Sequence, residues 1–299
     1  MNTRLTNKLN IKYPFIMAPM FLVSNKEMLK VAIDEGIAGV IPSLNYLNSD
    51  KLAFDIDELN QYEKGKEGSF GVNLIIKGNP KYNEHLDILV EKKVPLVITS
   101  LGNPTEVIEK VHAYGGTVLC DVTNLKFAKK ASHADGFVAV GQGAGGHSGN
   151  ISLQVLMPIL RREFPDKIII GAGGVATKAG FSSIMALGAD GVSVGTVFIA
   201  SKESEVSIEY KNAVINAEVE DIVMSRILSG TPATIIRSDY LSGLEDQLKE
   251  KNLELSRGIE LLQKSGSDAD YNKIFVAGQA VAFVKKELSV SEIIKNIIK

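Results

Sequence analysis

The sequence predicts an α/β protein with two parts: a (β/α)8 TIM barrel, and a smaller α+β lobe after its eighth strand. Short apolar runs bounded by glycine alternate with helical patterns, as parallel strands do in βα units. Eight such runs recur roughly every 20 to 33 residues, which is the repeat of a barrel. Glycine-rich turns follow the last three runs. Such turns after the closing strands of a barrel are typical of a phosphate site.

Bulk composition excludes several classes of protein. With 299 residues, the chain is long enough for one barrel with an appended lobe. A net charge of −2 argues against a nucleic-acid partner, which would leave a basic surface. The only cysteine, Cys120, excludes an intramolecular disulfide framework and fits a reducing cytoplasm.

The sequence predicts neither a signal peptide nor a membrane-spanning segment. Residues 2–12 are polar and lack the apolar core of a signal peptide. Glycines and charges such as Lys178 and Asp190 interrupt the most apolar regions, so no membrane span is expected. We therefore expect a cytoplasmic protein.

The eight strands follow one another at regular intervals. They are predicted at residues 13–17, 38–41, 69–75, 96–99, 117–120, 137–140, 168–170 and 192–194. Ser24 is expected to cap the first barrel helix, with Glu27 at the capping-box position. A doubly wound sheet would have five or six strands and a glycine fingerprint after the first. The glycines here come late, so the barrel is preferred.

The pattern changes after residue 201. A helix is expected at 203–219, extended segments at 222–227 and 233–237, a long helix at 240–264 and a linker at 265–269. Because this region has no βα rhythm, we expect a barrel domain at 1–200 and a smaller substrate or lid domain at 201–273. The tail, 274–299, is expected to pack back on the barrel as helices at 275–286 and 290–298.

Two consecutive glycine turns predict an anion site. Gly173 and Gly174 follow the seventh strand, and Gly195 and Thr196 follow the eighth. Glycine lets the backbone approach a ligand closely, and the N–H groups of such turns point at an anion. Packing alone could also select these glycines. The dinucleotide fingerprint is not cleanly present in these turns, and no Walker lysine follows them.

His147 is the candidate catalytic residue. It lies in a glycine-rich loop after the sixth strand, where a side chain can face a ligand. Imidazole exchanges a proton near neutral pH, as general acid–base catalysis requires. His85, His112 and His133 fall on predicted helices or helix ends, and we interpret them as surface residues.

Three further residues stand out, and two of them, Asn73 and Met20, have two interpretations each. Asn73 lies in an otherwise apolar strand, so its amide needs either a core partner or a heterocyclic ligand. Met20, after the first strand, is either a core residue or an apolar backing for a flat ring. Cys120 is interpreted as a buried, inert thiol. No metal-binding spacing is present in the sequence.

On these residues the sequence resembles the nitronate monooxygenase family, once called 2-nitropropane dioxygenases. The resemblance covers nearly the whole chain, and its most specific part is the loop Ala144-Gly145-Gly146-His147-Ser148-Gly149. The other matching motifs are Met17-Ala18-Pro19-Met20, Gly71-Val72-Asn73, Gly171–Gly174, Gly195-Thr196, Ser229-Gly230 and Ala277-Gly278-Gln279. Two positions depart from the family pattern: Gly143 replaces a frequent acidic residue, and Thr234 replaces an arginine.

The resemblance implies FMN as cofactor. Its phosphate would be held at Gly173, Gly174, Gly195 and Thr196. The residues implied to contact the rest of the cofactor are Ala18, Pro19, Met20, Asn73 and Gly145. The implied partners are a small nitronate or nitroalkane and O2, with no nucleic acid and no membrane; a homodimer stays open.

Three functions are considered, of which the resemblance implies the first two. The first is an FMN-dependent nitronate monooxygenase with His147 as its base. The second is an NAD(P)H-dependent enoyl-acyl-carrier-protein reductase or quinone reductase on the same FMN barrel. The third, which nothing in the sequence requires, is a barrel that binds a phosphorylated ligand without chemistry.

Overall fold

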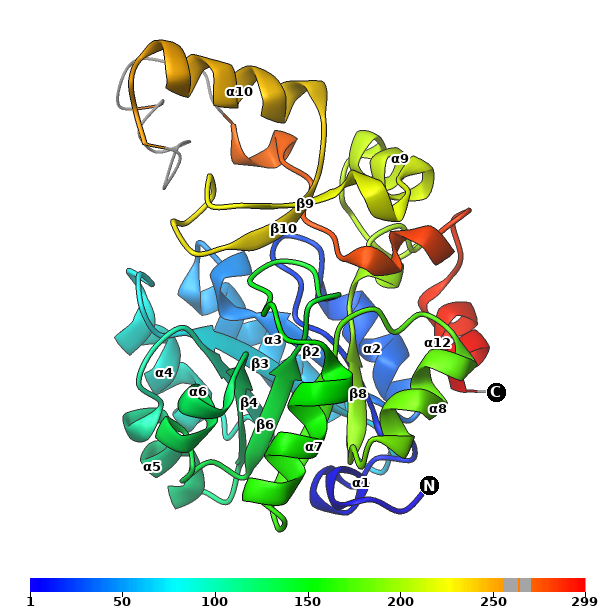
Figure 1. Ribbon diagram of the computed structural model, residues 1–299. Helices are drawn as coiled ribbons and strands as arrows, with labels where there is room; N and C mark the ends of the chain where they lie inside the picture. The colour runs from blue at the N-terminus through cyan, green and yellow to red at the C-terminus, as the bar shows by residue number, and fades with distance from the viewer. Residues whose placement is uncertain (255–262, 264–269, 299) are drawn as a thin grey trace.

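Eight parallel strands close into a barrel in the computed structural model, which describes residues 1–254, 263 and 270–298. Each strand pairs with the next in sequence, and β8 pairs with β1, with Ile16 opposite Ser193 (Figure 1). The predicted (β/α)8 barrel is therefore confirmed. The strands are β1 (Phe15–Met17), β2 (Ala38–Pro42), β3 (Ser69–Ile75), β4 (Leu96–Ser100), β5 (Thr117–Val122), β6 (Gly136–Val140), β7 (Ile168–Ala172) and β8 (Gly191–Val194).

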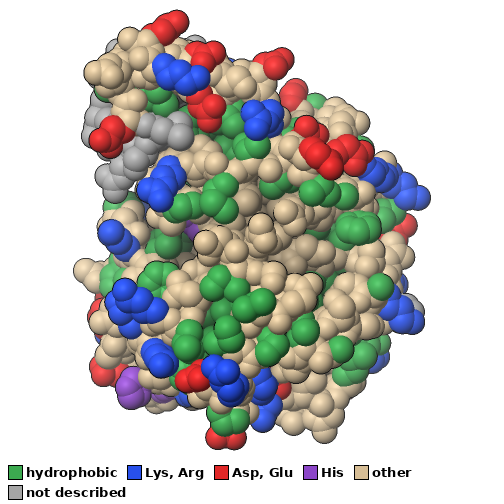
Figure 2. Space-filling view, in the orientation of Figure 1, with side chains coloured by type: hydrophobic (Ala, Val, Ile, Leu, Met, Phe, Trp, Pro, Cys, Tyr) green, Lys and Arg blue, Asp and Glu red, His purple; other side chains and the backbone are tan. Residues whose placement is uncertain are grey.

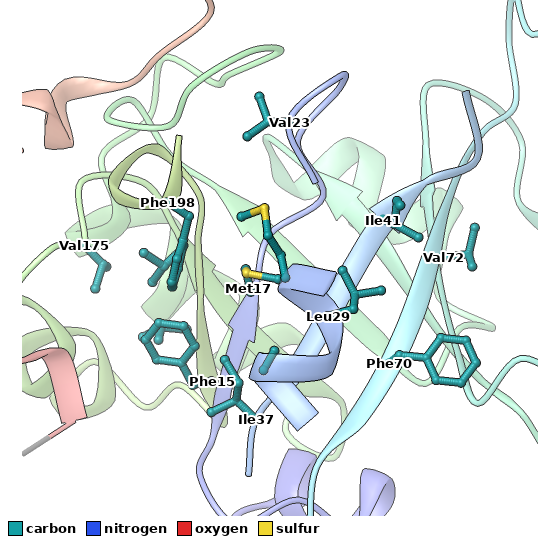
Figure 3. Close-up of a cluster of buried hydrophobic side chains, with 14 of the residues drawn as sticks. Phe15, Met17, Val23, Leu29, Ile37, Ile41, Phe70, Val72, Val175 and Phe198 are labelled. Atoms are coloured by element: carbon teal, nitrogen blue, oxygen red, sulfur yellow. The ribbon is translucent and has the colours of Figure 1, made fainter. Parts of the chain in front are cut away.

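Helices follow the strands and cover the outside of the barrel. They are α2 (Lys26–Asp34), α3 (Ser49–Tyr62), α4 (Tyr82–Glu91), α5 (Thr105–Ala113), α6 (Leu125–Lys130), α7 (Leu153–Glu163) and α8 (Lys178–Ala186). Outward-facing strand residues and the inner helix faces form a continuous apolar layer, in which Phe15 packs edge-on against Phe198 (Figure 3). This burial is the main stabilising contribution to the barrel.

The cap of α2 differs from the prediction. Asn25, not Ser24, is the N-cap, and its side chain accepts a hydrogen bond from the amide of Met28. Ser24 is unavailable because its hydroxyl accepts from the amide of Met20, at 3.0 Å. Glu27 therefore does not complete a capping box.

A second apolar cluster fills the barrel interior. It consists of Leu5, Leu9, Ile11, Ile16, Ala38, Val40, Leu96, Ile98, Leu119, Val138, Val140, Ala144, Ile168, Ile170 and Ala172. Residues alternate between the two faces of a strand, so on β4 and β5 the inward positions are Leu96, Ile98 and Leu119. The first residues form a helix, α1 (Arg4–Leu9), where only a lead-in was expected; its apolar side chains close the amino-terminal end of the barrel.

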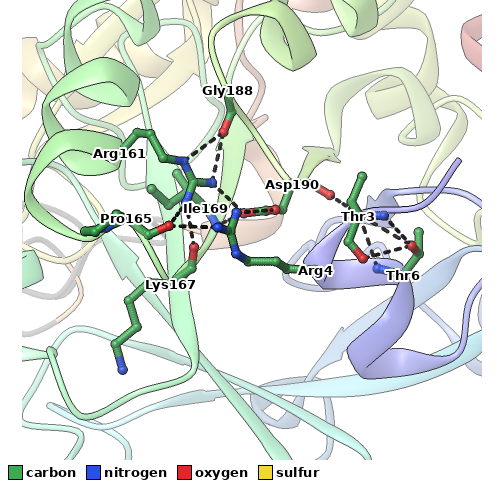
Figure 4. Close-up of polar contacts among 9 residues, drawn as sticks. All are labelled: Thr3, Arg4, Thr6, Arg161, Pro165, Lys167, Ile169, Gly188 and Asp190. Atoms are coloured by element: carbon green, nitrogen blue, oxygen red, sulfur yellow. Dashed lines mark hydrogen bonds and ion pairs between the residues drawn. The ribbon is translucent and has the colours of Figure 1, made fainter.

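A polar cluster anchors α1 at that end. The Asp190 carboxylate accepts from Arg161, at 2.6 Å, from Arg4, at 3.3 Å, and from the amide of Ile169 (Figure 4). The other N–H groups of Arg161 donate to the backbone carbonyls of Gly188, Pro165 and Lys167. The buried carboxylate is thus paired and hydrogen-bonded, as burial of a charge requires.

The lobe lies over the carboxyl-terminal end of the barrel (Figure 1). Its elements are α9 (Ile208–Asn216), an antiparallel pair, β9 (Ile222–Ser225) and β10 (Ala233–Ile236), and α10 (Asp239–Glu250). It has an apolar cluster of its own, formed by Ile227, Ile235, Leu241, Leu244, Leu248 and Ile274. The helix expected at 240–264 ends at Glu250; its predicted continuation over 255–262 and 264, and the linker at 265–269, lie outside the described residues.

The tail confirms one predicted helix and not the other. The helix α12 (Val290–Ile298) is present, whereas 275–286 contains only a short 3-10 helix, η5 (Gln279–Phe283). The carbonyls of Phe275 and Val276 accept from Ile236 and from the Tyr210 hydroxyl, so they cannot form helix bonds. The other 3-10 helices are η1 (Ser43–Asn45), η2 (Thr196–Phe198), η3 (Val219–Asp221) and η4 (Tyr271–Lys273).

On the face shown in Figure 2, basic and acidic side chains are interspersed, and hydrophobic ones gather towards its centre. Of the helices in the described ranges, none combines the length and apolarity needed to cross a bilayer.

Candidate functional site

The glycine turns after β7 and β8 lie side by side at the carboxyl-terminal end of the barrel. Gly173 and Gly174 both have positive φ, +129° and +71°, which L side chains rarely adopt. A Cβ built on Gly174 would meet no atom within 4 Å, so open space lies above this backbone. The neighbouring strand ends at Val194, Gly195 follows it, and η2 begins at Thr196. Adjacent glycine turns with open space above one of them are suited to an anion.

The end of β1 borders this surface. A Cβ on Gly195 would lie 3.4 Å from the Ala18 side chain and 3.5 Å from that of Met20. Met20 is half-buried and packs against the outer apolar layer. The first turn of the barrel and the turn after β8 are therefore in contact, as the sequence motifs around Pro19 and Thr196 suggested.

The loop after β6 is held by close backbone contacts. A Cβ on Gly143 would lie 3.1 Å from the amide nitrogen of Gly174, and one on Gly145 would lie 2.9 Å from that of Gly278. The Gly278 amide also donates to the Thr196 hydroxyl, at 3.0 Å. Glycine is needed here because side chains would push the loop off its supports. Gly145 thus packs on the tail segment while remaining exposed on its other side.

His147 faces the lobe. Its Nε2 lies 2.7 Å from the Ser229 hydroxyl, which belongs to the turn between β9 and β10. Burial lowers the pKa of His147 below its usual value, so the ring is neutral at pH 7. When Nε2 donates its proton to Ser229, the lone pair of Nδ1 is free to accept a proton from a substrate. The neighbouring Ser148 hydroxyl is buried and has no hydrogen-bond partner among the described residues.

A main-chain bridge joins the same loop to the lobe. Gly146 and Thr234 pair as an isolated antiparallel bridge. The Thr234 hydroxyl also donates to the carbonyl of Ala144, at 2.6 Å. The lobe therefore sets the position of the histidine loop.

Asn73 lies at the wall of the barrel mouth. Its amide nitrogen donates to the carbonyl of Ile98, at 3.0 Å, and to the hydroxyl of Ser100, at 2.8 Å. Ser100 lies 2.5 Å from a carboxylate oxygen of Asp121, on the next strand. Sequence reasoning singled out Asn73 and missed Ser100 and Asp121. Both occupy inward positions at strand ends, so the alternation along β4 and β5 could have identified them.

The other singled-out residues have structural roles. Cys120 is buried, and burial raises the pKa of its thiol to about 11, as expected of an inert cysteine. His112 and His133 are exposed, as predicted. His85 is not: it is fully buried on α4, with no hydrogen-bond partner for either ring nitrogen among the described residues. It packs on the same helix face as Leu89, one turn later. In the described ranges, no group of three His, Cys, Asp or Glu side chains could hold a metal ion.

The geometry is that of a (β/α)8 barrel with an appended lobe, and comparison with known proteins identifies its family. The family model described as nitronate monooxygenase matches residues 71–299. The chain belongs to the nitronate monooxygenase family and is an oxidoreductase.

Individual relatives agree with this assignment. A protein of Staphylococcus saprophyticus named "Probable nitronate monooxygenase" is 26% identical, over 100% of this chain and 97% of its own. The structure of FabK from Thermotoga maritima superposes with a TM-score of 0.86 at 29% identity, covering 99% of this chain and 95% of that one. A nitroalkane oxidase from Streptomyces ansochromogenes has the same fold, with a TM-score of 0.80, 21% identity, and coverage of 98% and 96%.

Proposed function

We propose that the protein is an FMN-dependent nitronate monooxygenase that oxidises alkyl nitronates and nitroalkanes with O2. Membership of the family supports the reaction class. The observation that carries the proposal is the position of His147: a neutral imidazole held by Ser229 in the loop that packs against the anion-binding turns.

The residues present fit a flavin mononucleotide. The positive φ of Gly173 and Gly174, with open space above the latter, supports a phosphate at their N–H groups and those of Gly195 and Thr196. The unpartnered hydroxyl of Ser148 is a further polar group available to a ligand.

The flat ring would lie across the barrel mouth. Ala18, Pro19 and Met20 offer it an apolar surface, and the carbonyl oxygen of Asn73 offers an acceptor to its N–H edge. When bound, FMN supplies the redox chemistry, taking electrons from the substrate and passing them to O2.

His147 would act as general base. A neutral imidazole can remove the proton from the carbon that bears the nitro group, giving the nitronate. Ser229 keeps the ring in one orientation while this proton moves. With a substrate supplied as its nitronate, no proton has to be removed, and the same side chain would instead orient the anion.

The lobe would act as the substrate or lid domain, with boundaries at residues 201–273. Ser229 and Thr234 both reach the histidine loop from it. A substrate enclosed between lobe and barrel would be shielded from water, which strengthens electrostatic interactions within the site.

Oxygen uptake tests the proposal. Wild-type protein loaded with FMN should consume O2 with propionate 3-nitronate and with 2-nitropropane. The His147→Ala variant should retain FMN and lose about 100-fold or more of the 2-nitropropane rate, the usual contribution of a general base. If the flavin-loaded wild type consumes no oxygen with either compound, the monooxygenase assignment is wrong.

A reductase is the second candidate, because FabK superposes over nearly the whole chain at 29% identity. The reaction would be NAD(P)H-dependent reduction of an enoyl thioester or a quinone. Anaerobic bleaching of the flavin by NADH or NADPH would favour this reaction, and an unchanged flavin spectrum would count against it.

A further inference from the structure

Three polar side chains occupy neighbouring strands at the same level inside the barrel. Asn73 lies on β3, Ser100 on β4 and Asp121 on β5. All three face inward, because Val72, Val97 and Cys120, at odd spacings from them on the same strands, belong to the outer apolar layer. Below them, the inward residues Leu96, Ile98 and Leu119 belong to the apolar interior cluster. The three side chains therefore lie at the boundary between the apolar interior of the barrel and the candidate site at its mouth.

Hydrogen bonds join them in one chain. The Ser100 hydroxyl lies 2.8 Å from the Asn73 amide nitrogen and 2.5 Å from Asp121 Oδ2. An amide nitrogen only donates, and an ionised carboxylate only accepts. Ser100 therefore accepts from Asn73 and donates to Asp121.

The direction of these hydrogen bonds fixes the orientation of the Asn73 amide group. Both of its N–H groups are used, one by Ser100 and one by the Ile98 carbonyl. Its carbonyl oxygen can then only accept a hydrogen bond from elsewhere. An acceptor held in one orientation at the barrel mouth matches the N–H edge of a flavin ring.

We propose that Asp121, acting through Ser100, positions Asn73 against the flavin ring, and that the negative charge of Asp121 makes the bound flavin harder to reduce. This inference rests on the proposed FMN site. Reduction adds negative charge to the ring, and a nearby carboxylate opposes that charge in a poorly solvated interior. Asp121 would thus be a positioning residue rather than a catalytic one.

The negative charge of Asp121 depends on pH. Burial raises the pKa of Asp121 to about 6, and its bond with Ser100 partly offsets that effect. Other titratable groups on the surrounding elements are the outward-facing Cys120 thiol and His147 in the loop after β6. Asp135 and Lys167 precede β6 and β7, at the amino-terminal end of the barrel.

The experiment measures FMN binding and flavin reduction potential, not turnover. Apoprotein is titrated with oxidised FMN, and the potential of the bound flavin is measured from pH 5 to pH 8. At pH 8, Asp121→Asn should favour reduced over oxidised FMN by about tenfold relative to wild type, which equals a rise of about 30 mV. At pH 5, where wild-type Asp121 is itself protonated, the two proteins should agree. Ser100→Ala should weaken binding of oxidised FMN by roughly tenfold, because Asn73 loses an anchor.

Matched controls come from the same strands. Thr99→Val and Cys120→Ala alter the adjacent residues, which face outward and contact each other at 3.1 Å. Both should leave the affinity and the potential unchanged. A potential that rises equally at pH 5 and pH 8, or that does not change in Asp121→Asn, overturns the inference. Wild-type protein that binds no FMN would instead refute the proposed function itself.

Discussion

The imidazole of His147 and the hydroxyl of Ser229 are in hydrogen-bond contact at 2.7 Å, although 82 residues separate them in the sequence. The first belongs to the barrel and the second to the lobe. Ser229 also accepts from the amide of Thr231, at 3.3 Å, which holds its hydroxyl in place. The candidate base, His147, therefore belongs to the barrel but is oriented by a residue of the lobe.

Removing that contact should slow the reaction without unfolding the protein. For Ser229→Ala we expect kcat with 2-nitropropane to fall about tenfold, the effect of losing one orienting hydrogen bond, with little change in KM. In the His147→Ala background the same substitution should have no further effect. An equal additional loss in the double variant would show that Ser229 acts independently of His147.

Adding a methyl group at Gly174 should block cofactor binding. Gly174→Ala places a side chain in the open space above the turn and forces an L residue to φ +71°, at a cost of about 1–2 kcal/mol in the free energy of unfolding. Gly65→Ala is the matched control, because Gly65 has φ +77° and equally open surroundings, in the turn after α3. Urea denaturation of the apoproteins should show similar losses for both, whereas only Gly174→Ala should weaken FMN binding, by tenfold or more. Equal FMN affinities in the two variants would show that the phosphate does not bind at Gly174.

The pH dependence of turnover should follow His147. Burial lowers its pKa below 6.5, and the base works only when unprotonated, so kcat/KM with a nitroalkane should rise with pH and level off, with its midpoint below 6.5. The His147→Gln variant should lose this acid limb, and so should the wild type supplied with preformed nitronate. A midpoint above 6.5 would contradict the buried, neutral imidazole.

His85 should make the fold sensitive to acid. Burial is the main cause that lowers its pKa, so the unfolded chain binds its proton at a higher pH than the folded one. The free energy of unfolding should therefore fall as pH drops below 6.5. His85→Leu should remove this dependence and, because both ring nitrogens lack partners, stabilise the protein by roughly 1–3 kcal/mol at pH 5. His133→Gln, at an exposed position, should leave the pH profile of denaturation unchanged.

The barrel was predictable because its strands are covered on both faces. Such strands have the sequence pattern of short apolar runs, and glycine turns follow the last three, as at Gly173 and Gly195. The tail was not predictable in the same way. A helix was expected over 275–286, but the carbonyls of Phe275 and Val276 bond to the lobe, and tertiary contacts override local preference.

The site was predictable where one element carries the signal. The histidine loop and the glycine turns are local motifs, so their residues could be named from the sequence. His85 was misread although its spacing from Leu89 places both on the buried face of α4. Ser229 could not be predicted, because its pairing with His147 exists only when the lobe is folded over the barrel.

The amino-terminal helix affects how small molecules enter and leave the barrel. Leu5, Leu9 and Ile11 fill the amino-terminal end of the barrel, so the interior is closed at that end. Small molecules are therefore expected to enter and leave at the opposite end, where the lobe lies (Figure 1).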